Sequence, residues 1–176
     1  VFNDSKYVLL NTAFLDTLDY DNLCSGFGEM LKHALISDSR TWHDLLAFDL
    51  QNPDLPLLQK LVAQSVKVKE RIVEQDPYEK NIRKALNLGH TVGHAFESWA
   101  LKKGHPVLHG YAVAYGLVCE LYLSVVKTGL PTEVLREAVN YVKAFYSHLS
   151  YTCDDYEAFF ELMKHDKKNT ADGGIN

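Results

Sequence analysis

The segment from Arg83 to Glu97 concentrates residue types that bind metals and anions, at a spacing typical of one helix face. Treated as a helix, it places its polar residues within an arc of about 80°; they are Arg83, Asn87, His90, His94 and Glu97. Histidines four residues apart can share a metal ion or act on the same substrate. Gly89 and Gly93 favour this interpretation, because a glycine costs about 1 kcal/mol in a helix interior and so suggests close packing. The alternative, a solvent-facing helix face, stays open.

A second group of polar residues lies near the N-terminus, where Glu29, Lys32 and His33 interrupt an apolar segment. Glu29 and His33 can offer an oxygen and a nitrogen to a divalent cation, and Lys32 can hold an anion. The alternative is a surface pair between Glu29 and Lys32, which is common and contributes only about 0.2–0.5 kcal/mol.

His109 stands at the head of the apolar segment 109–128. A helix N-terminus disfavours a cationic imidazole, so we expect His109 to be neutral and able to bind a metal; simple capping or packing is the alternative. One carboxylate with two or three imidazoles is the ligand set of an open, catalytic zinc site. Glu29 and His90, with either His109 or His94, supply that set if their helices converge.

Lys69 occupies an unusual position in the predicted helix 58–73. At about 100° per residue, Lys69 falls in the middle of the apolar arc, whereas Lys67 points the opposite way. A lysine at such a position either extends its ammonium group to water or pairs with an anion such as a phosphate or carboxylate.

The elements that must position these residues read almost entirely as helices. Five prolines and ten glycines separate segments with a period near 3.6 residues. These segments are 22–37, 40–50, 54–74, 84–103, 109–128, 131–148 and 154–165. Residues 7–10 are the one strand candidate. We therefore expect an all-α multi-helix bundle with a short extended N-terminal segment, in which helix 109–128 is central because it is apolar on nearly every side.

Composition excludes several classes of protein. The 176 residues are 47% apolar with a net charge of −5, which indicates one ordinary globular domain and disfavours nucleic acid or an anionic membrane as a partner. We identify no apolar stretch approaching the roughly 20 residues of a membrane span, and no leader peptide. The three widely spaced cysteines form neither a disulfide framework nor a Cys-x-x-Cys zinc site, so we expect a reduced, cytosolic protein. The start at Val1 and the end in a Gly-Gly turn lead us to expect part of a longer protein.

The motifs together resemble the C-terminal domain of the 3-dehydroquinate synthase family. The resemblance is carried by SGFGEMLKHALI (25–36), the run from Lys69 to Glu97, LHGYAVAYGL (108–117) and HDKKN (165–169). It covers nearly the whole chain, and the pattern Arg-x-x-x-Asn-x-x-His-x-x-x-His followed by Leu-His-Gly is specific to this family and its sugar-phosphate cyclase relatives.

The resemblance implies a cytoplasmic, homodimeric enzyme of the shikimate pathway to aromatic amino acids. It would use NAD and a divalent metal, zinc or cobalt, to convert the sugar acid phosphate DAHP into 3-dehydroquinate and phosphate. Residues 1–176 would be the helical metal- and substrate-binding domain, inactive alone, with a separate N-terminal NAD-binding α/β domain. The implied metal ligands are Glu29, His90 and His109, and the implied proton-transfer groups are His94 and Glu79. The implied substrate ligands are Lys32, Lys69, Arg83, Asn87, Lys167 and Lys168, and the implied NAD contacts are Phe14, Leu15, Asp16 and Thr17.

Two departures from the family pattern are present. Asp76-Pro77 stands where the family usually has Asp-Glu, and the interval between His90 and His109 is longer than in some members, which makes His105 the substitute ligand. Glu97 takes a supporting role in this interpretation. The alternatives are another NAD- and metal-dependent cyclase acting on a heptulose phosphate, a polyol dehydrogenase of related fold, or a non-catalytic helical metal-binding or partner-binding module.

Overall fold

The computed structural model describes residues 6–164 and has an all-α fold over that range. Its α-helices are α1 (Tyr20–Leu35), α2 (Ser39–Leu46), α3 (Leu55–Gln75), α4 (His90–Lys102), α5 (His109–Thr128), α6 (Thr132–Phe145) and α7 (Tyr156–Lys164). Three short 3-10 helices are also present: η1 (Thr12–Thr17) precedes α1, η2 (Ile82–Asn87) lies between α3 and α4, and η3 (Cys153–Asp155) lies between α6 and α7. The predicted fold class is confirmed. Residues 7–10 are exposed and form no strand, so the strand candidate was wrong; no described segment pairs with them.

Aspartate side chains begin three of the helices. Asp19, Asp38 and Asp54 accept hydrogen bonds from the amides of the third residues after them, at 2.9, 2.8 and 3.1 Å. Each bond satisfies one amide of the first turn, which has no partner within its own helix. Helix α4 differs, because its N-cap is Gly89 and offers no side chain.

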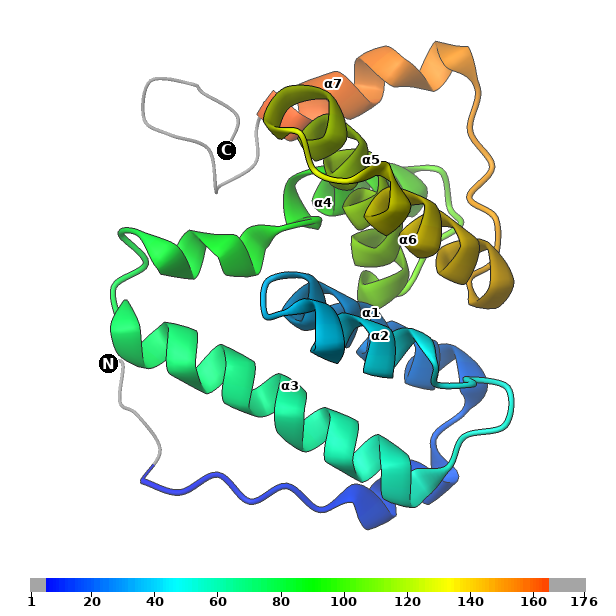
Figure 1. The fold of residues 1–176 in the computed structure, drawn as a ribbon. Coiled ribbons are helices and arrows are strands. Elements are labelled where there is room, and N and C mark those ends of the chain that lie inside the picture. Colours follow the sequence, from blue (N-terminus) through cyan, green and yellow to red (C-terminus); the bar gives the residue numbers. More distant parts are fainter. Residues whose placement is uncertain (1–5, 165–176) are drawn as a thin grey trace.

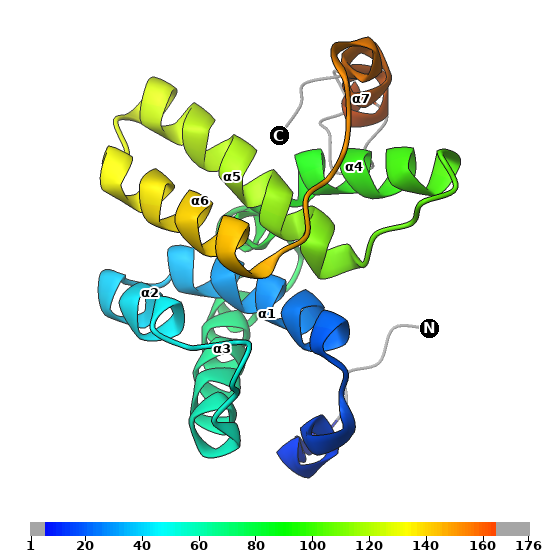
Figure 2. The same cartoon turned by 90° about the vertical axis from the view of Figure 1, so that its right-hand side faces the viewer.

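Helix α5 is the centre of the fold, with α1, α4 and α6 packed against it (Figure 1, Figure 2). Its first half is buried, as predicted, but Tyr122, Leu123 and Val126 in its second half are exposed. By length and composition α5 is also apolar enough to cross a membrane, contrary to the expectation from the sequence. Buried core helices pass the same test, and α5 packs between other helices of this fold.

Glycines allow the backbones of the central helices to touch. A Cβ atom on Gly110 of α5 would overlap the backbone carbonyl of Ser25 on α1, and one on Gly28 would overlap Gly110 itself. Gly116 meets the backbone of Gly89 in the same way. Since any side chain at these points would push the helices apart, the glycines set how closely α1 and α4 approach α5.

The predicted helix 84–103 is two elements. Residues 82–87 form η2, and α4 begins only at His90, because Gly89 adopts a left-handed conformation with φ 79°. The prediction of one continuous helix from Arg83 to Glu97 was therefore wrong, although His90, His94 and Glu97 do belong to one helix, α4.

Helix α3 buries a slightly different face from the one predicted. Its buried residues are Leu58, Leu61, Ser65, Val68 and Ile72. The buried stripe is rotated toward Ser65 and Val68, because Ser65 has a buried hydrogen-bond partner on α1. Lys69 lies outside this stripe and is exposed, so its predicted place among core side chains was wrong.

Candidate metal centre

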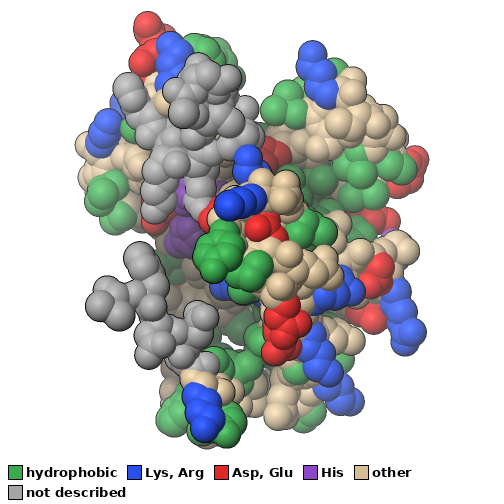
Figure 3. All heavy atoms as spheres, turned by 90° about the vertical axis from the view of Figure 1, so that its left-hand side faces the viewer, with side chains coloured by type: hydrophobic (Ala, Val, Ile, Leu, Met, Phe, Trp, Pro, Cys, Tyr) green, Lys and Arg blue, Asp and Glu red, His purple; other side chains and the backbone are tan. Residues whose placement is uncertain are grey.

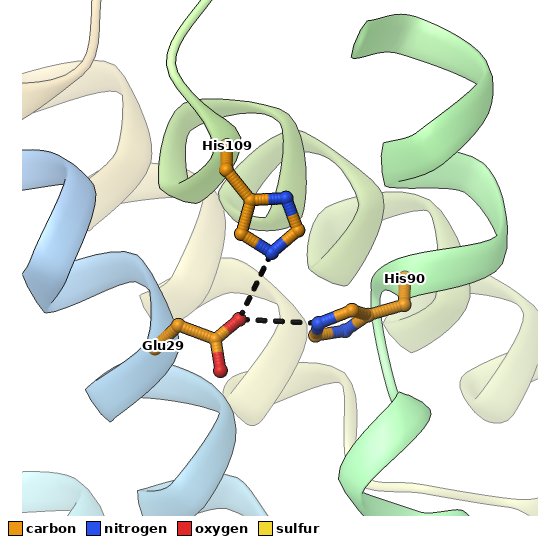
Figure 4. Close-up of side chains that lie close together, drawn as sticks. All are labelled: Glu29, His90 and His109. Atoms are coloured by element: carbon orange, nitrogen blue, oxygen red, sulfur yellow. Dashed lines mark ion pairs between the residues drawn. The ribbon is translucent and has the colours of Figure 1, made fainter. Parts of the chain in front are cut away.

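Glu29, His90 and His109 converge on one point from three helices (Figure 4). Glu29 Oε1 lies 3.1 Å from Nε2 of His90 and 3.5 Å from Nε2 of His109. One ligand atom from each residue lies within 4.8 Å of the others. In the sequence each of the three residues is next to one of the glycines at a helix contact, Gly28, Gly89 and Gly110. Close helix packing therefore brings the three side chains together.

Both histidines direct the same nitrogen toward the carboxylate. The Nδ1 atom of His90 is 3.2 Å from the Leu88 carbonyl, and Nδ1 of His109 is 3.1 Å from Oε2 of Glu97. An acceptor at each Nδ1 favours the tautomer that carries its proton there. In the neutral form of each ring the Nε2 lone pair would then face the carboxylate, where a cation can take the place of a proton, and Glu97 orients His109 from α4.

The charge at the centre is carried mainly by Glu29. Burial raises the pKa of Glu29, but the polar contacts from His109, His90 and Lys32 outweigh it and hold the pKa well below the usual range. The buried Lys32 ammonium lies 2.6 Å from Oε2 of Glu29. Glu29 thus stays ionised, with one oxygen on Lys32 and the other directed at the imidazoles.

His109 differs from the sequence prediction of a neutral imidazole. Its contact with the Glu29 carboxylate, followed by that with Glu97, outweighs burial and raises the pKa of His109 to about 9. The helix N-terminus acts in the opposite direction, but two carboxylates in contact have the larger effect. The prediction was wrong because it considered only the helix that begins at His109.

The donor set fits a divalent cation. Oε1 of Glu29 is shielded from solvent and accepts no hydrogen bond of good geometry from the described residues, while two imidazole nitrogens face it. A buried oxygen and two nitrogens with converging lone pairs are unfavourable unless a proton or a cation lies among them. One carboxylate and two imidazoles are a donor set that zinc and cobalt bind.

His94 extends the cluster to three imidazoles. Its ring centroid is 5.4 Å from that of His90 and 5.9 Å from that of His109. Among the described residues, the side chains whose ligand atoms come together are those of Glu29, His90 and His109, and His94 is not one of them. On the face shown in Figure 3, histidine side chains lie near the centre, beside basic and acidic side chains.

The loop between α3 and η2 brings three further predicted residues into one unit. The buried Asp76 carboxylate accepts hydrogen bonds from the amides of Lys80, Asn81 and Arg83 at 2.9, 2.6 and 3.2 Å. These bonds, the first most of all, lower the pKa of Asp76. The loop carries Glu79, whose Oε1 accepts a hydrogen bond from Asn87 at 2.8 Å.

Glu79 is the one described non-glycine residue with a positive φ, 55°. The side chain of Arg83, in the first turn of η2, donates to the carbonyl of Pro77 in this loop at 2.7 Å.

His33 directs its Nδ1 toward α3. Its Nδ1 is 2.7 Å from Oγ of Ser65 on α3, in a buried contact. Burial, helped by the charges of Lys32 and Lys69, lowers its pKa to about 4. The predicted pairing of Glu29 with His33 as ligands was wrong, because Glu29 converges with His90 and His109 while Nδ1 of His33 contacts Ser65 of α3. Lys69, though exposed, is close enough to act on this charge balance.

The remaining predicted residues lie away from this cluster or outside the described range. Phe14, Leu15, Asp16 and Thr17 form most of η1, where Phe14 is largely exposed and Leu15 packs against the core. His105 is an exposed loop residue. Lys167 and Lys168 lie outside the residues that the structure describes.

Three polar residues that sequence reasoning missed support the site. Ser65 holds His33, Asp76 holds the loop of Glu79, and Glu120 of α5 accepts a hydrogen bond from the Gly89 amide at 2.6 Å. A serine or glutamate within an apolar stripe is the available signal for two of them, and the sequence contains it at 65 and 120. Their partners lie on other helices, so a pattern within one helix does not identify them.

Comparisons with known proteins agree with the resemblance. The family model described as 3-dehydroquinate synthase C-terminal matches residues 26–169. A 3-dehydroquinate synthase of Parabacteroides distasonis is 52% identical over 168 residues, covering 96% of this chain and 47% of the relative. One from Streptococcus pyogenes serotype M6 is 36% identical over 165 residues, covering 93% and 45%.

A bifunctional 3-dehydroquinate synthase/phosphatase of Fusobacterium nucleatum is 34% identical over 172 residues, covering 96% of this chain and 26% of the relative. The chain thus spans about half the length of the two 3-dehydroquinate synthases named above, and about a quarter of the bifunctional protein.

Proposed function

The chain belongs to the family of 3-dehydroquinate synthase C-terminal domains, and on that premise we propose that it forms the metal- and substrate-binding part of a 3-dehydroquinate synthase. The reaction would convert DAHP into 3-dehydroquinate with release of phosphate, as the resemblance implies. The observation that carries the proposal is the convergence of Glu29, His90 and His109 on one point. Such a ligand set is expected where a reaction develops negative charge on substrate oxygens.

Glu29, His90 and His109 would hold the divalent cation, which supplies a Lewis acid for the hydroxyl groups of the substrate. Lys32 would hold Glu29 ionised and face an anionic substrate group, since it is buried beside the ligands. Arg83, Asn87 and Lys69, with Lys167 and Lys168, would bind the substrate's carboxylate and phosphate; fixing both ends of the substrate lowers the entropic barrier to reaction.

His94 and Glu79 would move protons. His94 packs against the rings of both ligand histidines, so a substrate held at the centre would lie within its reach. Glu79 lies on the loop whose amides bind Asp76, and its carboxylate accepts a hydrogen bond from Asn87; this loop would hold Glu79 in place for proton transfer with the substrate. Both are residue types that transfer protons near neutral pH when their surroundings bring their pKa values close to it.

NAD would bind between this chain and an α/β domain, with Phe14, Leu15, Asp16 and Thr17 facing it. The exposed Phe14 is consistent with a surface that is covered in the whole protein. We further propose a cytosolic homodimer with a small-molecule substrate and neither nucleic acid nor a membrane as a partner, in line with the net charge of −5.

The test is phosphate release from DAHP by the full-length protein with NAD and Zn²⁺ or Co²⁺ present. We expect turnover with the unsubstituted protein and with Glu157→Gln, an exposed position on α7, and loss of at least about 100-fold with Glu29→Gln or His90→Ala. Release from sedoheptulose 7-phosphate but not from DAHP would contradict the proposal in favour of a related cyclase. Loss of folding together with the metal, without turnover of either substrate, would favour a non-catalytic module.

A further inference from the structure

Glu120 lies on α5 with its carboxylate at the N-terminus of α4. Its Oε2 accepts a hydrogen bond from the Gly89 amide at 2.6 Å, and the amides of Thr91 and Val92 also lower its pKa. Burial acts more strongly and raises the pKa of Glu120 overall. A carboxylate that is removed from water and directed at backbone amides is bound to those amides rather than solvated.

Helix α4 needs this carboxylate because it has no cap of its own. Its N-cap, Gly89, has no side chain and adopts φ 79°. A Cβ atom at Gly89 would lie 2.8 Å from Cγ of Leu117 and 3.0 Å from the Val113 carbonyl oxygen, so α5 leaves no room for a capping residue there. The first-turn amides must still find acceptors, and a negative charge is favourable at this end of a helix. Glu120 supplies both from the neighbouring helix.

The capped turn is the one that carries a metal ligand. His90 is the first residue of α4, directly after the Gly89 amide that Glu120 binds, and its Nδ1 is held by the Leu88 carbonyl on the other side of that glycine. His109 begins α5, the helix that also carries Glu120. One helix thus contributes a ligand and also the group that fixes the start of the helix bearing another ligand.

We propose that Glu120 is a positioning residue for the metal centre, which fixes the start of α4 and thereby the place of His90 relative to Glu29 and His109. The inference deepens the function proposed above and rests on its metal site. Supporting groups of this kind change metal affinity by about 10–100-fold when removed. Metal binding by the unsubstituted protein tests the centre itself, whereas differences among Glu120 variants test the role of Glu120.

The experiment measures Zn²⁺ and Co²⁺ affinity of the full-length protein by competition with a chelator, together with the visible absorption of bound Co²⁺. Glu120→Gln keeps an oxygen at the same reach, and we expect its affinity within about threefold of the unsubstituted protein. Glu120→Asp keeps the charge but shortens the side chain, and Glu120→Ala removes the acceptor. Both should bind Zn²⁺ about 10–100-fold more weakly and change the Co²⁺ spectrum, because His90 is displaced.

Leu121→Ala is the matched control for stability. Leu121 is the next residue of α5 and is 3% exposed in the core, and its apolar side chain offers no acceptor to the amides of α4. We expect it to lower the melting temperature without changing metal affinity or the Co²⁺ spectrum. If Glu120→Ala and Glu120→Asp lower the melting temperature as Leu121→Ala does and leave affinity and spectrum unchanged, Glu120 is only structural and the proposal is wrong. If Glu120→Ala does not fold, the Zn²⁺ affinities of Glu120→Asp and Glu120→Gln are compared instead. Equal affinities of these two variants overturn the proposal, and a loss of affinity in Glu120→Asp alone supports it.

Discussion

Metal binding should compete with a proton on His109, which gives the centre a defined pH dependence. A pKa of about 9 leaves only about 1% of His109 neutral at pH 7, so a cation must displace one proton from nearly every molecule. Apparent affinity should therefore rise about tenfold per pH unit from pH 7 toward 9 and then level off, a total change of about 100-fold. Glu29 does not contribute to the pH dependence of metal affinity between pH 7 and 9, because its pKa is well below the usual range and it is already ionised.

Chelator-buffered Zn²⁺ titrations of the full-length protein between pH 6.5 and 10 measure this slope, and calorimetry in two buffers counts the released protons. We expect about one proton per metal from His109 at pH 7. Glu97→Gln removes one of the two carboxylates that raise the pKa of His109, so the affinity should level off at a lower pH. Glu157→Gln, on the exposed face of α7, is the control and should leave the curve unchanged.

An affinity that is flat between pH 7 and 9 would refute this reasoning. The pH dependence of the stability of the metal-free protein is an independent test of the raised pKa of His109. Because the folded pKa of His109 is raised above its unfolded value, protonation stabilises the fold fully below about pH 6.5, and that contribution is lost as pH rises through about 9. Unfolding of metal-free protein should become easier over that window, while metal-bound protein should not follow it.

Three substitutions extend the account. Gly110→Ala should lower the free energy of unfolding in urea by about 1–3 kcal/mol, because its Cβ would overlap the backbone of α1. In the control Gly26→Ala the new Cβ meets nothing within 4 Å, so that substitution should be neutral or stabilising. Equal effects of the two substitutions would contradict the close-contact argument. Glu97→Gln should weaken Zn²⁺ binding about 10–100-fold in chelator competition at about pH 10, where His109 is mostly neutral in both proteins, and unchanged affinity there would contradict its orienting role. Ser65→Ala should cost about 1–3 kcal/mol in thermal unfolding by leaving a buried nitrogen of His33 without its partner; no change would show that this contact contributes nothing.

Local patterns in the sequence predicted most of the helices and the ligand types. Apolar periodicity gave α1, α3, α5 and α6 to within a few residues, because each buries one continuous face. The same periodicity hid the break at Gly89, since the polar spacing continues across it while the backbone does not. A glycine alone does not reveal a left-handed residue; the close approach of α5 requires it here.

Properties that depend on other helices could not be predicted from one helix. Lys69 is exposed because Ser65 turns inward to His33 and the buried face of α3 is rotated toward Ser65. His109 has a raised pKa because Glu29 and Glu97 reach it from α1 and α4. The capping role of Glu120 likewise depends on a turn 31 residues away in the chain.

X-ray absorption at the zinc edge of the loaded full-length protein tests the central claim most directly. The account predicts two imidazoles and only oxygen or nitrogen donors at about 2.0–2.2 Å, with one imidazole lost in His90→Ala and one in His109→Ala. A spectrum with sulfur at about 2.3 Å, or one unchanged by either substitution, would show that the cation binds elsewhere and would contradict the account.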